Sequence, residues 1–207
     1  MVTKLELYNI AARHVGATRF ANVSEDRSDR RELDAVYDHA LDTFLEKGVW
    51  KFALRTIRMD PDPDITPAFG LRYAYSKPED FKRLHAFASD PYLESEIRDY
   101  REEAGYWYTD NAEVYLSYVS NHPTRGMNMG AYPAHYSEAL GAEMAKLAAL
   151  PISKSAGDRN DLFAIAAGTL RDAKKYDAID ERVKTRPIGR LVRSRIGNGR
   201  ATYNGRW

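Results

Sequence analysis

The chain has 207 residues, of which 43% are hydrophobic and 29% are charged, so it can bury a core and lacks the composition of a disordered protein. It contains no cysteine, which excludes a disulfide framework, thiolate catalysis and cysteine metal sites. No apolar run reaches the roughly 18 residues of a membrane-spanning helix, and the opening residues lack the pattern of a secretory signal. We therefore expect neither a membrane span nor a leader.

The net charge of +1 conceals an asymmetry along the chain. Residues 182–207 contain eight Lys and Arg and no Asp or Glu, so this stretch carries +8 and the preceding 181 residues carry −7. An acidic body followed by a basic tail indicates that the tail contacts an acidic partner.

Two helices are predicted in the first quarter of the chain. Thr3 and Glu6 have the spacing of a capping box, and apolar residues at helical spacing follow as far as Gly16. A second core-facing stripe runs over residues 33–45, and Gly48 is the residue expected to cap that helix in the left-handed conformation. These segments predict a helical hairpin.

The spacing of the apolar residues changes at Trp50. Apolar residues there alternate with polar or small ones, which is typical of a strand, and several aromatic residues further on suit a half-buried sheet. Turn residues separate most of the later segments. We predict short strands over residues 50–54, 71–75, 81–87, 97–101, 104–108 and 114–119.

Two further helices are predicted after the loop at residues 121–132. The first begins near Pro133 and is expected to end at Pro151, because proline cannot donate a backbone hydrogen bond. The second begins at Asp158 and runs to Val183. Many alanines in this pair predict close packing between the two helices.

Helices, strands and helices thus follow one another in separate blocks, which predicts an α+β architecture. We expect a helical bundle of residues 1–48 and 132–184, with an inserted antiparallel β-domain over residues 49–131. Residues 185–207 are expected to form an extended basic C-terminal tail.

No residue pattern predicts catalysis, a metal site or a cofactor, and we expect a protein that is not an enzyme. Asp60, Asp62 and Asp64 resemble the start of a calcium loop, but the glycine and the final glutamate of that loop are missing. None of the five histidines has the spacing of a zinc site. Residues 106–108, three consecutive aromatics, suit either a stacking platform for single-stranded nucleic acid or ordinary sheet packing, and packing is favoured.

The basic tail is the strongest candidate for a functional segment. Apolar side chains alternate with arginines there, a pattern typical of a segment that docks on a partner through apolar anchors while the arginines bind carboxylates or phosphates. Nucleic-acid binding by the same arginines is the alternative, and a tail without function is a third reading. The predicted docking residues are Arg186, Ile188, Arg190, Leu191, Arg193, Arg195, Tyr203, Arg206 and Trp207.

Five segments together resemble the head-to-tail adaptors, or tail tubular protein A family, of short-tailed bacteriophages. The resemblance covers most of residues 3–183 and rests on fold pattern, without a catalytic signature. The segments are Leu45–Phe52 at the end of the opening hairpin, Lys77–Leu84, Gly105–Asp110, Val114–Val119 and Tyr136–Ser153.

This resemblance implies a structural virion protein without an active site. It implies a ring of twelve copies at the head–tail interface, between the portal protein and the tail nozzle or tail tube protein, with the genomic DNA passing through the channel. It also implies that the C-terminal segment docks on the portal, which agrees with the tail's basic character.

Overall fold

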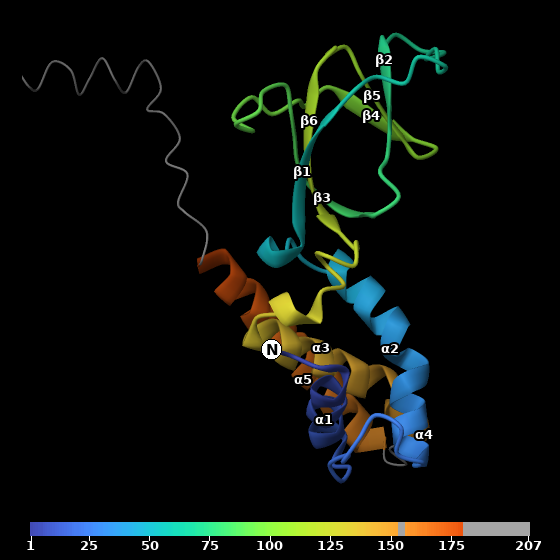
Figure 1. Ribbon diagram of the computed structural model, residues 1–207, viewed down its shortest axis with the longest axis vertical. Coiled ribbons are helices and arrows are strands. Elements are labelled where there is room, and N and C mark those ends of the chain that lie inside the picture. Colours follow the sequence, from blue (N-terminus) through green and yellow to red (C-terminus); the bar gives the residue numbers. More distant parts are fainter. Residues whose placement is uncertain (153–155, 180–207) are drawn as a thin grey trace, which may run out of the picture.

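The computed structural model of the chain describes residues 1–152 and 156–179. It is a mixed α+β protein in which the helices form one end of an elongated molecule and the strands form the other (Figure 1). The helices are α1 (Lys4–Val15), α2 (Ser28–Glu46), α3 (Ala134–Leu147), α4 (Ala149–Ile152) and α5 (Ala156–Ile179). The strands are β1 (Leu54–Met59), β2 (Tyr73–Ser76), β3 (Phe81–Ala88), β4 (Tyr100–Glu103), β5 (Tyr106–Thr109) and β6 (Val114–Ser120). The 3-10 helices are η1 (Lys51–Ala53) and η2 (Met129–Ala131).

Both ends of α1 follow the prediction. The Thr3 hydroxyl accepts a hydrogen bond from the backbone N–H of Glu6 at 3.2 Å, which satisfies one of the free amides at the start of the helix. Gly16 ends the helix with φ at 77°, a left-handed conformation that suits glycine. The α+β class and its antiparallel sheets are also confirmed.

Two helix-end predictions are wrong. Gly48 does not adopt the left-handed conformation, since Lys47 ends α2 in the right-handed region. A Cβ at position 48 would lie 2.8 Å from the Trp50 ring, so this glycine makes room for the indole. Pro151 does not end α3, which stops at Leu147; the proline lies in the first turn of α4, where its missing N–H costs no helical hydrogen bond.

The predicted strand at residues 50–54 is also wrong in its first part. The chain forms η1 there, closed by a hydrogen bond from the Ala53 N–H to the Trp50 carbonyl at 3.0 Å, and β1 begins only at Leu54. This turn lets the chain leave α2 and enter β1 while Trp50 and Phe52 remain packed in the helical core. Tertiary packing therefore overrides the alternating pattern.

Helix α3 is the centre of the helical part. It packs against α1, α2 and α5, and buried side chains cover nearly its whole circumference over residues 136–145. Gly141 allows the close approach of α1, because a Cβ there would lie 2.3 Å from Cγ2 and 2.8 Å from Cβ of Ile10. Within the two described ranges, no helix has the length and apolarity needed to cross a membrane.

The strands form two three-stranded antiparallel sheets with the orders β1-β6-β3 and β2-β5-β4. The sheets share a second hydrophobic core. Trp107 of β5 is fully buried in it, with its ring 5.1 Å from that of Phe81 and 5.8 Å from that of Phe87, both on β3. The aromatic side chains thus hold one sheet against the other.

Strand β6 joins the two cores, and the helical core contains an aromatic cluster. Leu116 and Tyr118 of β6 belong to the core of the sheets, and Val119 belongs to the helical core. In the helical core, the buried Tyr136 ring of α3 is the common neighbour of four other rings. These rings are Phe44 at 5.2 Å, Trp50 at 4.9 Å, Phe52 at 4.6 Å and Tyr132 at 4.8 Å, measured between centroids.

Polar contacts reinforce the same junction. The Asp80 carboxylate accepts hydrogen bonds from Arg55 of β1 at 3.0 Å and from Tyr118 of β6 at 2.8 Å, and also from the Ser120 hydroxyl. Lys82 of β3 pairs with Asp42 of α2 at 2.6 Å. The sheet that contains β3 is therefore fixed to α2 by charge as well as by packing.

We predict opposite effects of alanine at two helical glycines. Gly141→Ala should lower the free energy of unfolding by about 1–3 kcal/mol, because Ile10 Cβ cannot move without its helix. Gly168→Ala, at a position of α5 with nothing within 4 Å, should raise it by roughly 0.5–1 kcal/mol through helix propensity. Urea unfolding of both variants measures this, and a stabilising Gly141→Ala would contradict the close approach.

We also predict a pH-dependent contribution from Asp80. Burial by itself raises the pKa of Asp80, but the hydrogen bonds from Ser120, Tyr118 and Arg55 outweigh burial and lower that pKa below its ordinary value. A lowered pKa contributes stability above the ordinary Asp range, and this contribution disappears as the pH falls through the folded value.

Asp80→Asn should therefore lower the free energy of unfolding by about 1–3 kcal/mol near neutral pH, and the difference from the wild type should shrink towards about pH 2. The control is Asp64→Asn, at an exposed aspartate, which should change little. Denaturant unfolding at several pH values tests this, and a difference that is independent of pH would contradict it.

Candidate functional site

The docking residues predicted in the tail all lie outside the described residues. They are Arg186, Ile188, Arg190, Leu191, Arg193, Arg195, Tyr203, Arg206 and Trp207, and their role stays a prediction. The functional surfaces that the structure does place belong to the helices and to the junction with the sheets.

The aromatic strand has the geometry of sheet packing. Trp107 is fully buried, and its Nε1–H donates to the Glu102 carboxylate at 3.1 Å, so the indole offers no free face for a base. Tyr106 and Tyr108 lie on the opposite face of β5, half-buried and 6.2 Å apart between ring centroids. Of the two readings of this segment, the structure supports packing.

The acidic turn and the histidines do not assemble into a metal site within the described ranges. The Asp62 carboxylate accepts a hydrogen bond from the Asp64 N–H at 3.0 Å, as in an ordinary turn. His14 lies 2.9 Å from Glu138, and His135 packs against Tyr176 with ring centroids 5.5 Å apart. Each of these side chains therefore contacts its own neighbours, in a separate part of the molecule.

Helix α5 has a row of exposed apolar side chains, the α5 stripe, beside its buried face, where Tyr176 also packs against His135 of α3. The stripe consists of Ile165, Tyr176 and Ile179, which are 39%, 55% and 65% exposed and lie within about 60° of one another around the helix at 3.6 residues per turn. The buried side of α5 carries Leu162 and Ala173 instead. The stripe thus adjoins the buried face of α5, and the exposed Asp172 lies in the same row between Ile165 and Tyr176.

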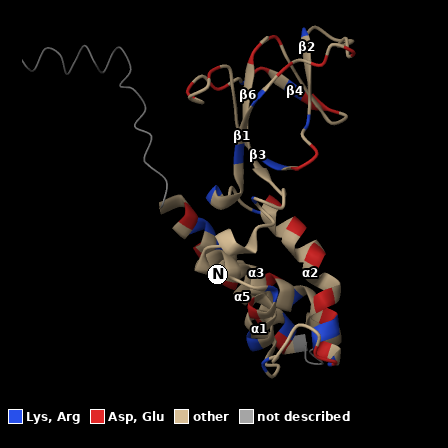
Figure 2. Ribbon diagram, in the orientation of Figure 1, with Lys and Arg blue, Asp and Glu red and all other residues tan. Residues whose placement is uncertain are grey.

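The exposed side of α2 is acidic. Asp34, Asp38, Asp42 and Glu46 recur every four residues, and Figure 2 shows Asp and Glu along this helix. Asp34 pairs with Lys4 at 2.8 Å, and Asp42 pairs with Lys82, whereas Asp38 is exposed. Hydrogen bonds from Lys4 and Tyr8 lower the pKa of Asp34, so it remains ionised at neutral pH.

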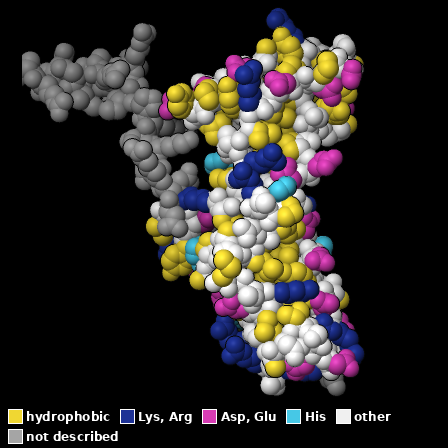
Figure 3. Space-filling model, viewed as in Figure 1, with side chains coloured by type: hydrophobic (Ala, Val, Ile, Leu, Met, Phe, Trp, Pro, Cys, Tyr) yellow, Lys and Arg dark blue, Asp and Glu magenta, His cyan; other side chains and the backbone are white. Residues whose placement is uncertain are grey.

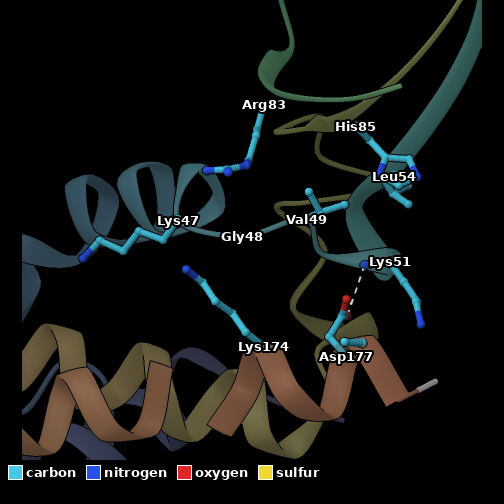
Figure 4. Close-up of a pocket in the computed structure, with 10 residues that line it drawn as sticks. Lys47, Gly48, Val49, Lys51, Leu54, Arg83, His85, Lys174 and Asp177 are labelled. Carbon is cyan, nitrogen blue, oxygen red and sulfur yellow. Dashed lines mark hydrogen bonds between the residues drawn. The ribbon is translucent and has the colours of Figure 1, made fainter. Parts of the chain in front are cut away.

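A pocket of about 370 Å³ lies where the helices meet the sheets, and most of its charged side chains are basic (Figure 4). Figure 3 also shows Lys and Arg side chains at this level on the face in view. The pocket is formed by the end of α2, η1, the start of β1, β3 and the last turns of α5. Its charged or titratable residues are Lys47, Lys51, Arg83, His85, Lys174 and Asp177.

Some of these charges already have partners. Lys47 pairs at 2.7 Å with Glu143, a buried carboxylate of α3 that also binds Lys146. Burial alone raises the pKa of Glu143, but its hydrogen bonds to Lys146 and Lys47 outweigh burial and lower the pKa. Asp177 accepts a hydrogen bond from the Lys51 backbone N–H at 3.2 Å, which fixes the end of α5 to η1.

Two cations on opposite walls retain donors that face the pocket. Arg83 Nη1 donates to the Glu46 carbonyl at 2.7 Å, which uses only one of the five guanidinium N–H groups. Within the described ranges, Lys174 forms no salt bridge. Figure 4 shows both charged ends on the same side of the pocket, near the end of α2.

Sequence reasoning missed this pocket because its residues come from positions 47–178 and have no shared motif. It also missed the α5 stripe, since an apolar residue on a helix is expected to face the core. Comparison with known proteins adds no relative: no protein-family model and no curated protein matches the chain.

Proposed function

We propose that this chain is a structural virion subunit of the head-to-tail adaptor type. Copies of it assemble into a ring between the portal protein and the tail nozzle of a short-tailed phage, and DNA passes through the channel. The observation that carries the proposal is the α5 stripe, a set of exposed apolar side chains on the helical part of the molecule. The resemblance in five sequence segments supplies the biological setting.

A ring subunit needs lateral surfaces that complement its neighbour, and a head-to-tail contact closes into a ring when its rotation closes. Ile165, Tyr176 and Ile179 provide exposed apolar side chains of the kind found at interfaces, with Tyr176 in the last turn of α5. Strand β6, which contributes side chains to both cores, connects the helical part that carries this patch to the sheets.

The tail has a separate role in this proposal. Residues 186–207 dock on the portal through apolar anchors and arginines, while the acidic body faces the channel and repels the phosphates of the passing DNA. If the arginines bound nucleic acid instead, binding would weaken steeply with salt, because each neutralised phosphate releases counterions. Salt dependence therefore separates these two uses of the tail.

The stripe predicts a specific loss of self-association. Ile165→Lys combined with Tyr176→Lys should weaken subunit association by about three orders of magnitude, since each of the two buried apolar anchors contributes roughly 2 kcal/mol. Native mass spectrometry and sedimentation equilibrium measure the effect. The control, Tyr92→Lys, removes a 79% exposed aromatic from the sheet end and should leave association unchanged. Equal association of the double variant and the wild type would contradict the interface.

The tail predicts a loss of portal binding without a loss of fold. Deleting residues 186–207 should leave the thermal unfolding midpoint within about 2 °C, because the described cores do not include these residues. The truncated chain should fail to bind purified portal rings in a pull-down at moderate salt. Normal attachment of the truncated chain would contradict the docking role, and binding that is lost only at raised salt would favour nucleic-acid-type contacts.

A further inference from the structure

We propose that the pocket at the junction of helices and sheets binds an oxyanion, a phosphate or a carboxylate group, between Arg83 and Lys174 (Figure 4). This inference is independent of ring assembly and of the tail. It concerns a site whose residues come from β3, α5 and the segment that connects α2 to β1.

The first argument is the balance of charge around the pocket. Four Lys or Arg side chains line it, and Asp177 is its single acid. The Asp177 carboxylate already accepts the Lys51 N–H, and the Glu143 carboxylate behind Lys47 serves both Lys47 and Lys146. An excess of positive charge in a recess with protein walls concentrates the field, so the pocket attracts anions.

The second argument is the arrangement of the donors. Arg83 reaches in from the sheet and Lys174 from α5, and their charged ends lie on one side of the pocket in Figure 4. Arg83 is held in place by its bond to the Glu46 carbonyl and still has the fork of N–H groups that binds an oxyanion bidentately. Lys174 adds a point charge with rotatable donors from the opposite wall.

The third argument is size. A volume of about 370 Å³ exceeds that of a single ion and falls in the range of small-ligand sites, about 300–1,000 Å³. The pocket therefore accommodates an oxyanion with the group that carries it, such as a phosphorylated small molecule or an acidic side chain. His85 and Leu54 form the wall on the far side from the two cations, where the carrier would lie.

Binding at this place has a mechanical consequence. The ligand would connect the sheet, through Arg83, with the last turns of α5, through Lys174. The junction already contains the Lys82–Asp42 pair, the Asp177–Lys51 bond and the Arg83–Glu46 bond, and a bound anion adds a further polar link between the two ends of the molecule. We therefore expect the bound form to unfold at a higher temperature.

The test is a titration of the full chain with inorganic phosphate and, in parallel, with acetate, at constant ionic strength maintained with sodium chloride. Isothermal calorimetry and thermal unfolding are the readouts. Saturable binding of either probe above the chloride background supports the site. Preference for phosphate identifies a phosphate group as the ligand, and equal binding or preference for acetate identifies a carboxylate.

Variants connect any binding to these residues. Lys174→Met should weaken binding about tenfold or more, because it removes a charge-assisted hydrogen bond. Lys175→Met is the matched control, since Lys175 is an exposed neighbour on the same helix and does not line the pocket. Arg83→Met should weaken binding further. If loss of the Arg83 bond to Glu46 disturbs the fold, Lys174→Met still tests the site, because Lys174 does not take part in that bond.

Two results would overturn the proposal. One is the absence of saturable binding of both probes at millimolar concentration. The other is an equal loss of affinity in Lys174→Met and Lys175→Met, which would show a diffuse charge effect instead of a site.

Discussion

The contact of four aromatic rings with Tyr136 is the constraint on which the rest of the structure depends. The chain passes from helices to strands next to Trp50 and Phe52, and it returns to helices next to Tyr132. All three rings pack on Tyr136 of α3. Both crossings between the two ends of the molecule are therefore anchored at one side chain.

Burying the Tyr136 hydroxyl costs free energy. Burial raises the pKa of Tyr136 well above its ordinary value, and the hydroxyl has no hydrogen-bond partner among the described residues. The ring contacts offset that cost, since aromatic pairs of this geometry contribute about 0.5–1.5 kcal/mol each beyond area burial. The two hydrophobic cores are connected by the side chains of β6 and by the Lys82–Asp42 pair.

The connected cores carry the three surfaces to which roles are proposed. The apolar stripe on α5, the acidic side of α2 and the basic pocket have fixed positions relative to one another because the cores beneath them are joined. In the proposed ring, the stripe provides lateral contact, acidic surface repels the DNA phosphates, and the tail reaches the next ring. Each of these proposed roles depends on the charge or the apolarity of the segment concerned.

The sequence predicted elements well where local chemistry decides them. Thr3 and Gly16 mark the ends of α1 because capping depends on neighbouring backbone groups alone. The predictions from the sequence failed where contacts between distant residues determine the local structure. Trp50 lies in a strand pattern, but its packing on the Tyr136 ring holds the segment in a turn. Gly48 has the residue type of a helix cap, yet the indole of Trp50 requires the glycine for space.

Surfaces were predicted less well than elements. The basic tail could be recognised because its arginines fall within one short stretch of sequence. Arg83 and Lys174 are far apart in the sequence and line the same pocket only in the folded chain. The α5 stripe has the same residue types as a core face, so only packing shows which side of the helix is left exposed. The β-sheet pairing likewise depends on contacts between distant segments, such as β1 with β6.

The most direct measurement of the central claim is quantitative mass spectrometry of purified phage particles, with the copy number of this chain scaled to the portal protein. A head-to-tail adaptor ring predicts a ratio near one copy per portal subunit. Complete absence of the chain from well-purified particles would contradict the adaptor function.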